Sequence, residues 1–139
     1  MHEEYAINIE PKEIPKDDPL ERKIKRISLK GMSSTRAALN ILHAANALGT
    51  FQPPGNFRLR RIKDLELKNV SVREALNRIV IADGHAMWVV SPVKNRGTLS
   101  LFFGLWEDKY QIAEHDLKGP EYHEEMQRIH ESWSKWNVR

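Results

Sequence analysis

The chain has 139 residues, enough for one domain with a hydrophobic core of its own. It contains no cysteine, which excludes a disulfide framework, a thiol nucleophile and thiolate metal ligands. The net charge of +3 is unevenly spread along the chain. Residues 1–20 contain six acidic and two basic groups, residues 21–106 contain five acidic and fifteen basic groups, and residues 107–139 contain eight acidic and five basic groups. Two interpretations are open: the acidic ends fold back onto the basic centre, or the centre attracts an anionic partner. We favour the first, because lysine and arginine on a surface usually serve only to keep it solvated.

The sequence contains no segment that we expect to span a membrane. No apolar run approaches the ~18 residues that a membrane-spanning helix needs. The first ten residues are polar and acidic, and they lack the basic and apolar regions of a signal peptide. We therefore expect a periplasmic or envelope location only if a signal peptide has been removed, and a cytoplasmic location otherwise.

The two ends of the chain are predicted to differ in structure. Residues 1–20 form an extended arm, because prolines at every fourth position block a helix: Pro11, Pro15 and Pro19. Residues 107–139 form a polar connection followed by an amphipathic helix, whose apolar stripe consists of Tyr122, Met126, Ile129, Trp133 and Trp136. We expect this helix to dock on its own domain, with docking on another chain as the alternative.

An internal repeat lies between these ends, in residues 21–106. Residues 29–42 (LKGMSSTRAALNIL) align with residues 67–79 (LKNVSVREALNRI) after a one-residue insertion. Two copies are too few for a solenoid, which needs about three or more stacked units. They are predicted to pack against each other as a pseudo-symmetric pair around one core.

Each copy predicts a strand followed by a capped helix. Alternating apolar residues predict the strands, at Ile27 and Leu29 in the first copy and at Leu65 and Leu67 in the second. Ser71 followed by Glu74 is a capping box, and Ser33 or Ser34 caps the first helix. Apolar residues then recur at helical spacing, from Ala38 to Leu48 and from Val72 to Val80. Gly49 and Gly84 are placed where a left-handed C-terminal cap is expected.

Further strands are predicted after each helix. They cover residues 50–52, residues 57–67 with a kink near Arg60 and Arg61, residues 86–90, and residues 98–106 after a hairpin turn at 95–97. The predicted fold class is α+β. Duplicated βαβ units form a small mixed sheet with two helices, plus an extra hairpin strand and the C-terminal amphipathic helix.

The second copy and its continuation match the pattern of a known family. The matching residues are 65–76 (LELKNVSVREAL), then Gly84 and the run Trp88-Val89-Val90. This pattern resembles the short domain at the N-terminus of secretins and of TonB-dependent signalling receptors, an STN-like domain. The first copy fits the preceding half, so the resemblance covers about residues 24–91. It implies two βαβ units around a small sheet, a periplasmic setting and docking to other envelope proteins without catalysis.

No pattern of catalytic or cofactor-binding residues is present. The six histidines lack zinc-protease spacing, and serine-nucleophile, P-loop and dinucleotide-binding motifs are absent. His123 and His130 lie near one helix face, and we interpret them as solvated. His43 is expected to be partly buried. We therefore expect no enzyme activity, no metal ion and no cofactor.

Three groups of residues are the predicted partner-binding surface. In the strand 98–106, alternate residues face the core, which leaves Phe102 and Trp106 on the other face. Either the C-terminal helix covers these two aromatics with Trp133 and Trp136, or they meet another protein. The third group is the basic strand, with Arg58, Arg60 and Arg61.

The duplicated capped unit, together with the absence of a chemical site, leads to the hypothesis of a non-catalytic protein-interaction domain, an adaptor of the bacterial cell envelope. Its partner would be an envelope or secretion component or a second copy of the chain. The alternative is a cytoplasmic nucleic-acid-binding domain that uses the basic strand and neighbouring aromatics.

Overall fold

A computed structural model describes residues 18–52, 59–62, 64–84, 86–93, 97–105 and 117–137 of the chain. The elements are a 3-10 helix η1 (Pro19–Glu21), β1 (Lys23–Leu29), α1 (Ser34–Ala44), β2 (Leu48–Gln52), β3 (Leu65–Ser71), α2 (Val72–Asp83), β4 (Ala86–Val93), β5 (Thr98–Leu105) and α3 (Gly119–Asn137). The α+β class predicted from the sequence is confirmed.

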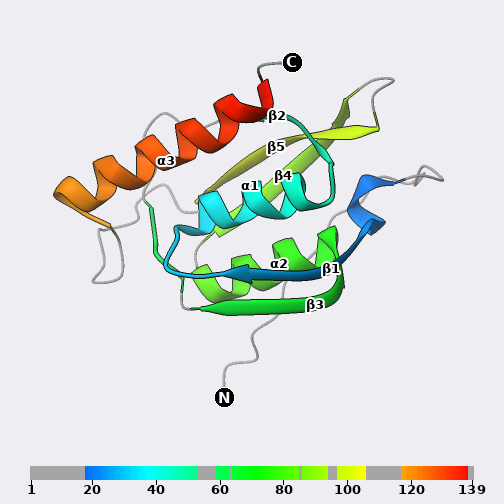
Figure 1. Ribbon diagram of the computed structural model, residues 1–139, viewed down its shortest axis with the longest axis horizontal. Helices are drawn as coiled ribbons and strands as arrows, with labels where there is room; N and C mark the ends of the chain where they lie inside the picture. Colours follow the sequence, from blue (N-terminus) through cyan, green and yellow to red (C-terminus); the bar gives the residue numbers. More distant parts are fainter. Residues whose placement is uncertain are drawn as a thin grey trace.

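The described residues form five strands in two sheets, with the helices α1 and α2 in a layer between them (Figure 1). β1 and β3 form an antiparallel pair. The second sheet is mixed and has the order β2-β5-β4, in which β5 is parallel to β2 and antiparallel to β4. Both sheets contribute apolar residues to the buried core: Ile24, Leu29, Leu67 and Val70 from the first, and Phe51, Leu99, Leu101 and Phe103 from the second. The expected small mixed sheet is thus the three-stranded one, and the two-stranded sheet closes the other side of the core.

The internal repeat is visible in the topology. β1–α1–β2 and β3–α2–β4 follow the same order, β1 pairs with β3, and α1 packs on α2. β5 lies outside the repeat and joins the two copies, because it is inserted between β2 and β4. Leu39 and Leu76 occupy equivalent positions and are both fully buried, so the two copies share one core, as predicted.

Serine side chains begin both helices at the predicted positions. The Ser33 Oγ accepts a hydrogen bond from the N–H of Arg36 at 3.2 Å, and the Ser71 Oγ accepts one from the N–H of Glu74 at 3.1 Å. Each bond satisfies a backbone donor that the first turn of a helix leaves without an intrahelical partner. At the other end of α2, Gly84 takes the predicted left-handed conformation with φ of 88°.

The predicted cap at Gly49 is wrong, because α1 ends earlier, at Ala44. Asn46 adopts the left-handed conformation instead, with φ of 52°, and Leu48, predicted on the helix, begins β2. Gly49 lies within β2 at a shift in its register with β5. A Cβ atom at Gly49 would lie 2.6 Å from the Oγ1 of Thr98. This glycine therefore permits a close approach between β2 and the start of β5.

The prediction of one long strand over residues 57–67 is wrong for the residues of this range that the structure describes, 59–62 and 64–67. β3 begins only at Leu65, and Arg61 forms an isolated bridge with Ser33. The N–H of Ser34 donates to the carbonyl of Arg60 at 3.0 Å. The backbone at Arg60 and Arg61 is thus hydrogen-bonded to the segment that begins α1. Residues 57, 58 and 63 lie outside the described residues.

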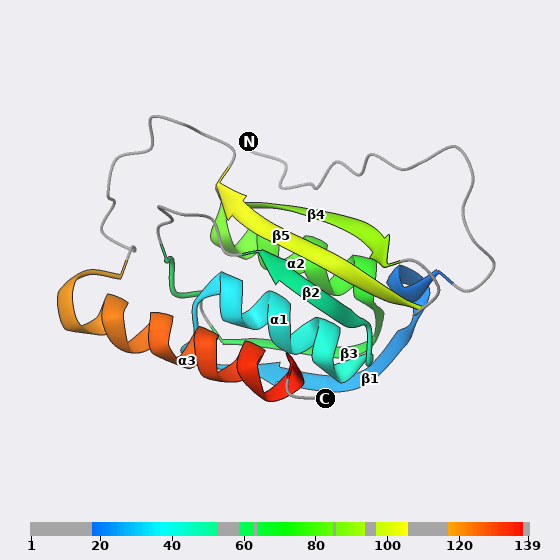
Figure 2. The same ribbon diagram turned by 90° about the horizontal axis from the view of Figure 1, so that it is seen from above.

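The C-terminal helix α3 packs on α1 of its own domain, as predicted (Figure 2). Ile129 is buried in the core, and Tyr122 and Met126 are partly buried against it. Trp133 and Trp136 lie on α3, but their side chains are outside the described residues.

Acidic residues near both ends of the chain pair with its basic centre. In the described part of the chain, three ion pairs make these connections: Arg73 with Asp18, Arg61 with Glu121, and Arg36 with Glu125. They support the interpretation that the acidic ends fold back onto the domain. Of the predicted arm, residues 1–17 lie outside the described residues, and Pro19 and Leu20 are buried in η1.

Candidate protein-docking surface

The strand β4 is an edge of the three-stranded sheet, and among the described residues no strand pairs with its outer side. Its eight residues include no charged side chain. Sheet edges are usually protected by charges, by proline or by shortness, because unpaired backbone groups invite another strand. Of these, β4 has only Pro92, next to its end. As far as the described residues go, most of β4 is therefore open to strand addition.

The outer face of the sheet is apolar beside this edge. Met87 is 36% exposed and Val89 is 49% exposed. Val89 lies opposite Phe102 of β5, and Met87 lies opposite Gly104. Residues directly opposite in an antiparallel pair share one face of the sheet. We call Met87, Val89 and Phe102 the β4–β5 outer patch.

The other face of β4 is fixed to the core. Trp88 and Val90 alternate with the outer residues and pack against buried side chains. The indole N–H of Trp88 donates to the Oδ1 of Asn77 on α2 at 3.1 Å. Contacts on its inner face thus hold β4 in place. The β4–β5 outer patch is therefore ordered before a partner binds, which lowers the entropy cost of binding.

Of the four aromatic residues predicted to contact a partner, only Phe102 has a described side chain. It is half-buried, while its neighbours Leu101 and Phe103 are buried in the core, as the alternation predicts. Trp106 lies outside the described residues, and so do the side chains of Trp133 and Trp136.

The described arginines of the predicted basic strand, Arg60 and Arg61, contact two different helices. Arg60 is half-buried, and its Nη1 donates to the carbonyl of Asp83 at the end of α2, at 2.8 Å. Arg61 is exposed, and its Nη2 lies 3.4 Å from a carboxylate oxygen of Glu121 on α3. Arg58 lies outside the described residues. These contacts tie the segment to two helices.

Sequence reasoning did not single out Met87 and Val89. The segment from Ala86 to Val90 is apolar at every position, which is typical of a strand covered on both faces. In the structure the helices cover only one face of β4, so the outward-facing half of that run is left exposed. The apolar run is visible in the sequence, but whether its outward-facing residues are buried or exposed depends on which element covers the second face of β4.

The buried or half-buried polar groups Ser34, Asp83 and His43 lie inside the fold rather than at the β4–β5 outer patch. Ser34 and Asp83 are both buried, and the Ser34 hydroxyl donates to the Asp83 carboxylate. This bond joins the start of α1 to the end of α2. His43 is half-buried, and this burial lowers its pKa to about 4. Within the described ranges no group of three histidine or carboxylate side chains could hold a metal ion.

No protein-family model matches the chain, and no curated protein or solved structure is significantly similar to it. Fold and surface therefore define its class: an α+β domain with two helices between two sheets, in which β4 is an apolar edge strand that no other described strand covers. None of the helices in the described ranges combines the length and the apolar composition that a bilayer crossing demands.

Proposed function

We propose that the chain is a non-catalytic protein-docking domain, in which β4 and the β4–β5 outer patch take up an extended segment of another protein. The observation that carries this proposal is an uncharged edge strand, β4, on which Met87 and Val89 are exposed. In strand addition the backbone of the partner completes the hydrogen bonds of the edge, and alternate side chains rest on the face. The partner segment should therefore carry apolar residues at alternate positions.

We propose the bacterial cell envelope as the setting. Support comes from the resemblance of residues 65–76 and 84–90 to the N-terminal domain of secretins and TonB-dependent receptors. The repeated strand–helix–strand order supports this resemblance, and it differs from paired βαβ units in that the two strands of each copy lie in different sheets. The partner is then an envelope or secretion component, and a second copy of the chain is the competing occupant of β4.

Nucleic-acid binding through the predicted basic strand has less support. Arg60 already donates to the carbonyl of Asp83, and Arg61 already faces Glu121. Using them to contact phosphates would require these internal contacts to be exchanged.

The test selects ligands from a library of random peptides displayed on phage and maps them on the isotope-labelled full chain by NMR. We expect the selected peptides to show alternating apolar residues and to shift the amide signals of β4. Val89→Asp should weaken binding about tenfold or more, because it places a charge on the patch that the peptide must desolvate. The matched control, Gln127→Asp on exposed α3, adds the same charge and should leave affinity unchanged.

Two outcomes contradict the proposal. Equal weakening by both substitutions would show that the site lies elsewhere. Concentration-dependent dimerisation measured by light scattering, if Val89→Asp abolishes it, would assign the edge to a second copy of the chain instead.

A further inference from the structure

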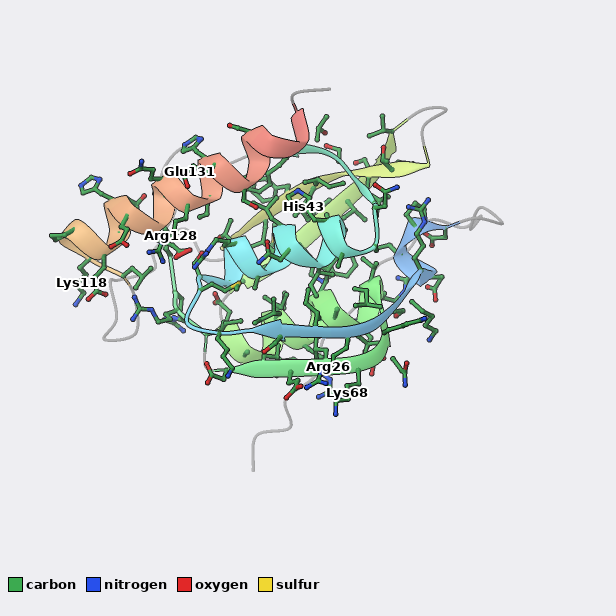
Figure 3. The ribbon with its side chains drawn as sticks, in the orientation of Figure 1. Arg26, His43, Lys68, Lys118, Arg128 and Glu131 are labelled. Carbon is green, nitrogen blue, oxygen red and sulfur yellow. The ribbon has the colours of Figure 1, made fainter. Side chains whose placement is uncertain are left out.

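The two-stranded sheet carries a second surface of different chemistry. Exposed basic side chains lie on β1, directly after it and on β3: Lys23, Lys25, Arg26, Lys30 and Lys68. Glu66 is the one acidic residue of the two strands. We call this set of five cations the β1–β3 basic face. Figure 3 shows Arg26 and Lys68 on the side of the sheet that is turned away from α1 and α2.

Like charges are placed opposite each other on this face. Arg26 and Lys68 are cross-strand neighbours, an arrangement that destabilises a sheet when nothing compensates it. Glu66 accepts a hydrogen bond from the Nε of Arg26 at 3.0 Å. Bonding to Arg26, followed by the charges of Lys68 and Lys30, holds the pKa of Glu66 below its ordinary value. A single carboxylate therefore lies in the positive field of three cations.

The backbone is also irregular at this point. Asn69 follows Lys68 and has φ of 52°, a left-handed conformation that costs energy for a residue other than glycine. Lys68 and Asn69 are both exposed between two buried residues, and Lys25 and Arg26 on β1 are likewise adjacent and exposed. Regular alternation would turn one residue of each pair inward. The irregularity thus places more cations outside than two regular strands would.

The acidic ends of the chain do not neutralise this face within the described residues. The acids that fold back pair with arginines elsewhere: Asp18 and Glu21 with Arg73, Glu121 with Arg61, and Glu125 with Arg36. A surface that only keeps a protein soluble usually intersperses both signs. Among the described residues, the five cations of the β1–β3 basic face are accompanied by one carboxylate on the same two strands, Glu66.

We propose that the β1–β3 basic face binds an acidic, extended segment of a partner protein. Alternate residues of an extended chain are about 7 Å apart, so carboxylates at alternate positions match the rise along β1. The face has no aromatic side chain on which a base could stack, since β1 and β3 contain none. It also lacks the exposed apolar side chains that accompany cations in membrane-surface elements.

The β1–β3 basic face lies across the helix layer from the β4–β5 outer patch. It would therefore be a second binding surface, separate from the docking site at β4. The two can therefore fail separately. Val89→Asp should leave binding at the basic face intact, and substitutions in the basic face should leave peptide uptake by β4 intact.

The probe is a fluorescent peptide in which Glu and Ser alternate, titrated with the full chain at low and at high salt. We expect binding that weakens as salt rises, because exposed ion pairs are screened. Lys25→Glu with Lys68→Glu should weaken it about tenfold or more. The matched control, Arg78→Glu with Lys118→Glu, makes the same change in charge at exposed sites on α2 and before α3, and should weaken it far less.

Circular dichroism establishes that both variants fold, and Lys25→Gln with Lys68→Gln provides a milder variant that should lose binding to a smaller extent. Equal loss in the charge-reversed variant and its control would overturn the proposal, because only the net charge would then matter. Tighter binding to oligothymidylate or to phosphatidylglycerol vesicles than to the acidic peptide would also overturn it.

Discussion

Arg36 of α1 and Glu125 of α3 form an ion pair in which the carboxylate side chain is 5% exposed and the guanidinium side chain 19% exposed. The Nη2 of Arg36 lies 3.3 Å from the Oε2 of Glu125, and its Nε contacts the other carboxylate oxygen. The pair connects α3, which lies outside the repeat, to the first copy. Because both groups are largely removed from water, the loss of one leaves the other charge without compensation.

We predict that Glu125→Gln lowers the free energy of unfolding by about 3 kcal/mol, at the lower end for a broken buried pair because Arg36 keeps some solvent contact. The measurement is urea unfolding, with hydrogen exchange to show that protection is lost first in α3. Arg128→Ala is the control, since it breaks an exposed pair with Glu124 one helical turn away and should cost about 0.5 kcal/mol or less. Similar costs for the two changes would contradict a special role of the buried pair.

We predict that Gly49→Ala destabilises the domain by steric conflict. The new methyl group would lie 2.6 Å from the Oγ1 of Thr98 and 2.8 Å from the Cγ2 of Val93. Overpacking of this kind typically costs about 1–3 kcal/mol. Thr98→Ala should restore part of the loss in the double variant. At Gly31, where φ is 61° and the space is open, alanine should cost only the backbone penalty, about 1 kcal/mol, and Thr98→Ala should restore none of it.

We predict that the two equivalent serine caps contribute similar stability. Ser33→Ala and Ser71→Ala each remove the acceptor for a backbone N–H in the first turn of a helix. Each change should cost about 1 kcal/mol, measured by urea unfolding. Ser34→Ala, which removes a bond to the buried carboxylate of Asp83 rather than a cap, serves as the comparison and should cost about 1–3 kcal/mol. A measurable loss at only one of the two serines would contradict their structural equivalence.

We predict that His43 makes the protein less stable in acid. Its pKa is lowered by burial from 6.5 to about 4, so the unfolded chain binds this proton more readily than the folded one. The stabilising contribution of the neutral ring is complete above about pH 6.5 and is lost as the pH falls toward 4. Because the ring is only half-buried, we expect about 1 kcal/mol rather than the full linkage value.

The measurement compares urea unfolding of the protein and of His43→Gln at pH 7 and at pH 5. The variant should lose less stability on acidification than the parent protein. An NMR titration that gives His43 a pKa near 6.5 would contradict the prediction.

The sequence by itself determined the repeat, the serine caps, the cap at Gly84 and the buried positions of β5. The repeat is visible because two segments of the sequence align, and the other features depend on residues a few positions apart, because helix periodicity, strand alternation and capping are local properties. The docking of α3 was also foreseeable, since Ile129 and its neighbours form an apolar stripe that must be covered.

Only the tertiary structure decided which strands pair and which faces stay exposed. Alternation along β1 and β3 shows that each has a buried face, yet it cannot show that these strands form a separate sheet with Arg26 opposite Lys68. In the same way, an apolar β4 is compatible with burial on both faces, and only the position of the helices leaves Val89 in solvent. Gly49 has the sequence context of a cap, but Thr98, which approaches it, lies 49 residues further along the chain, and no local pattern records this contact. Both candidate docking surfaces follow from such long-range pairings.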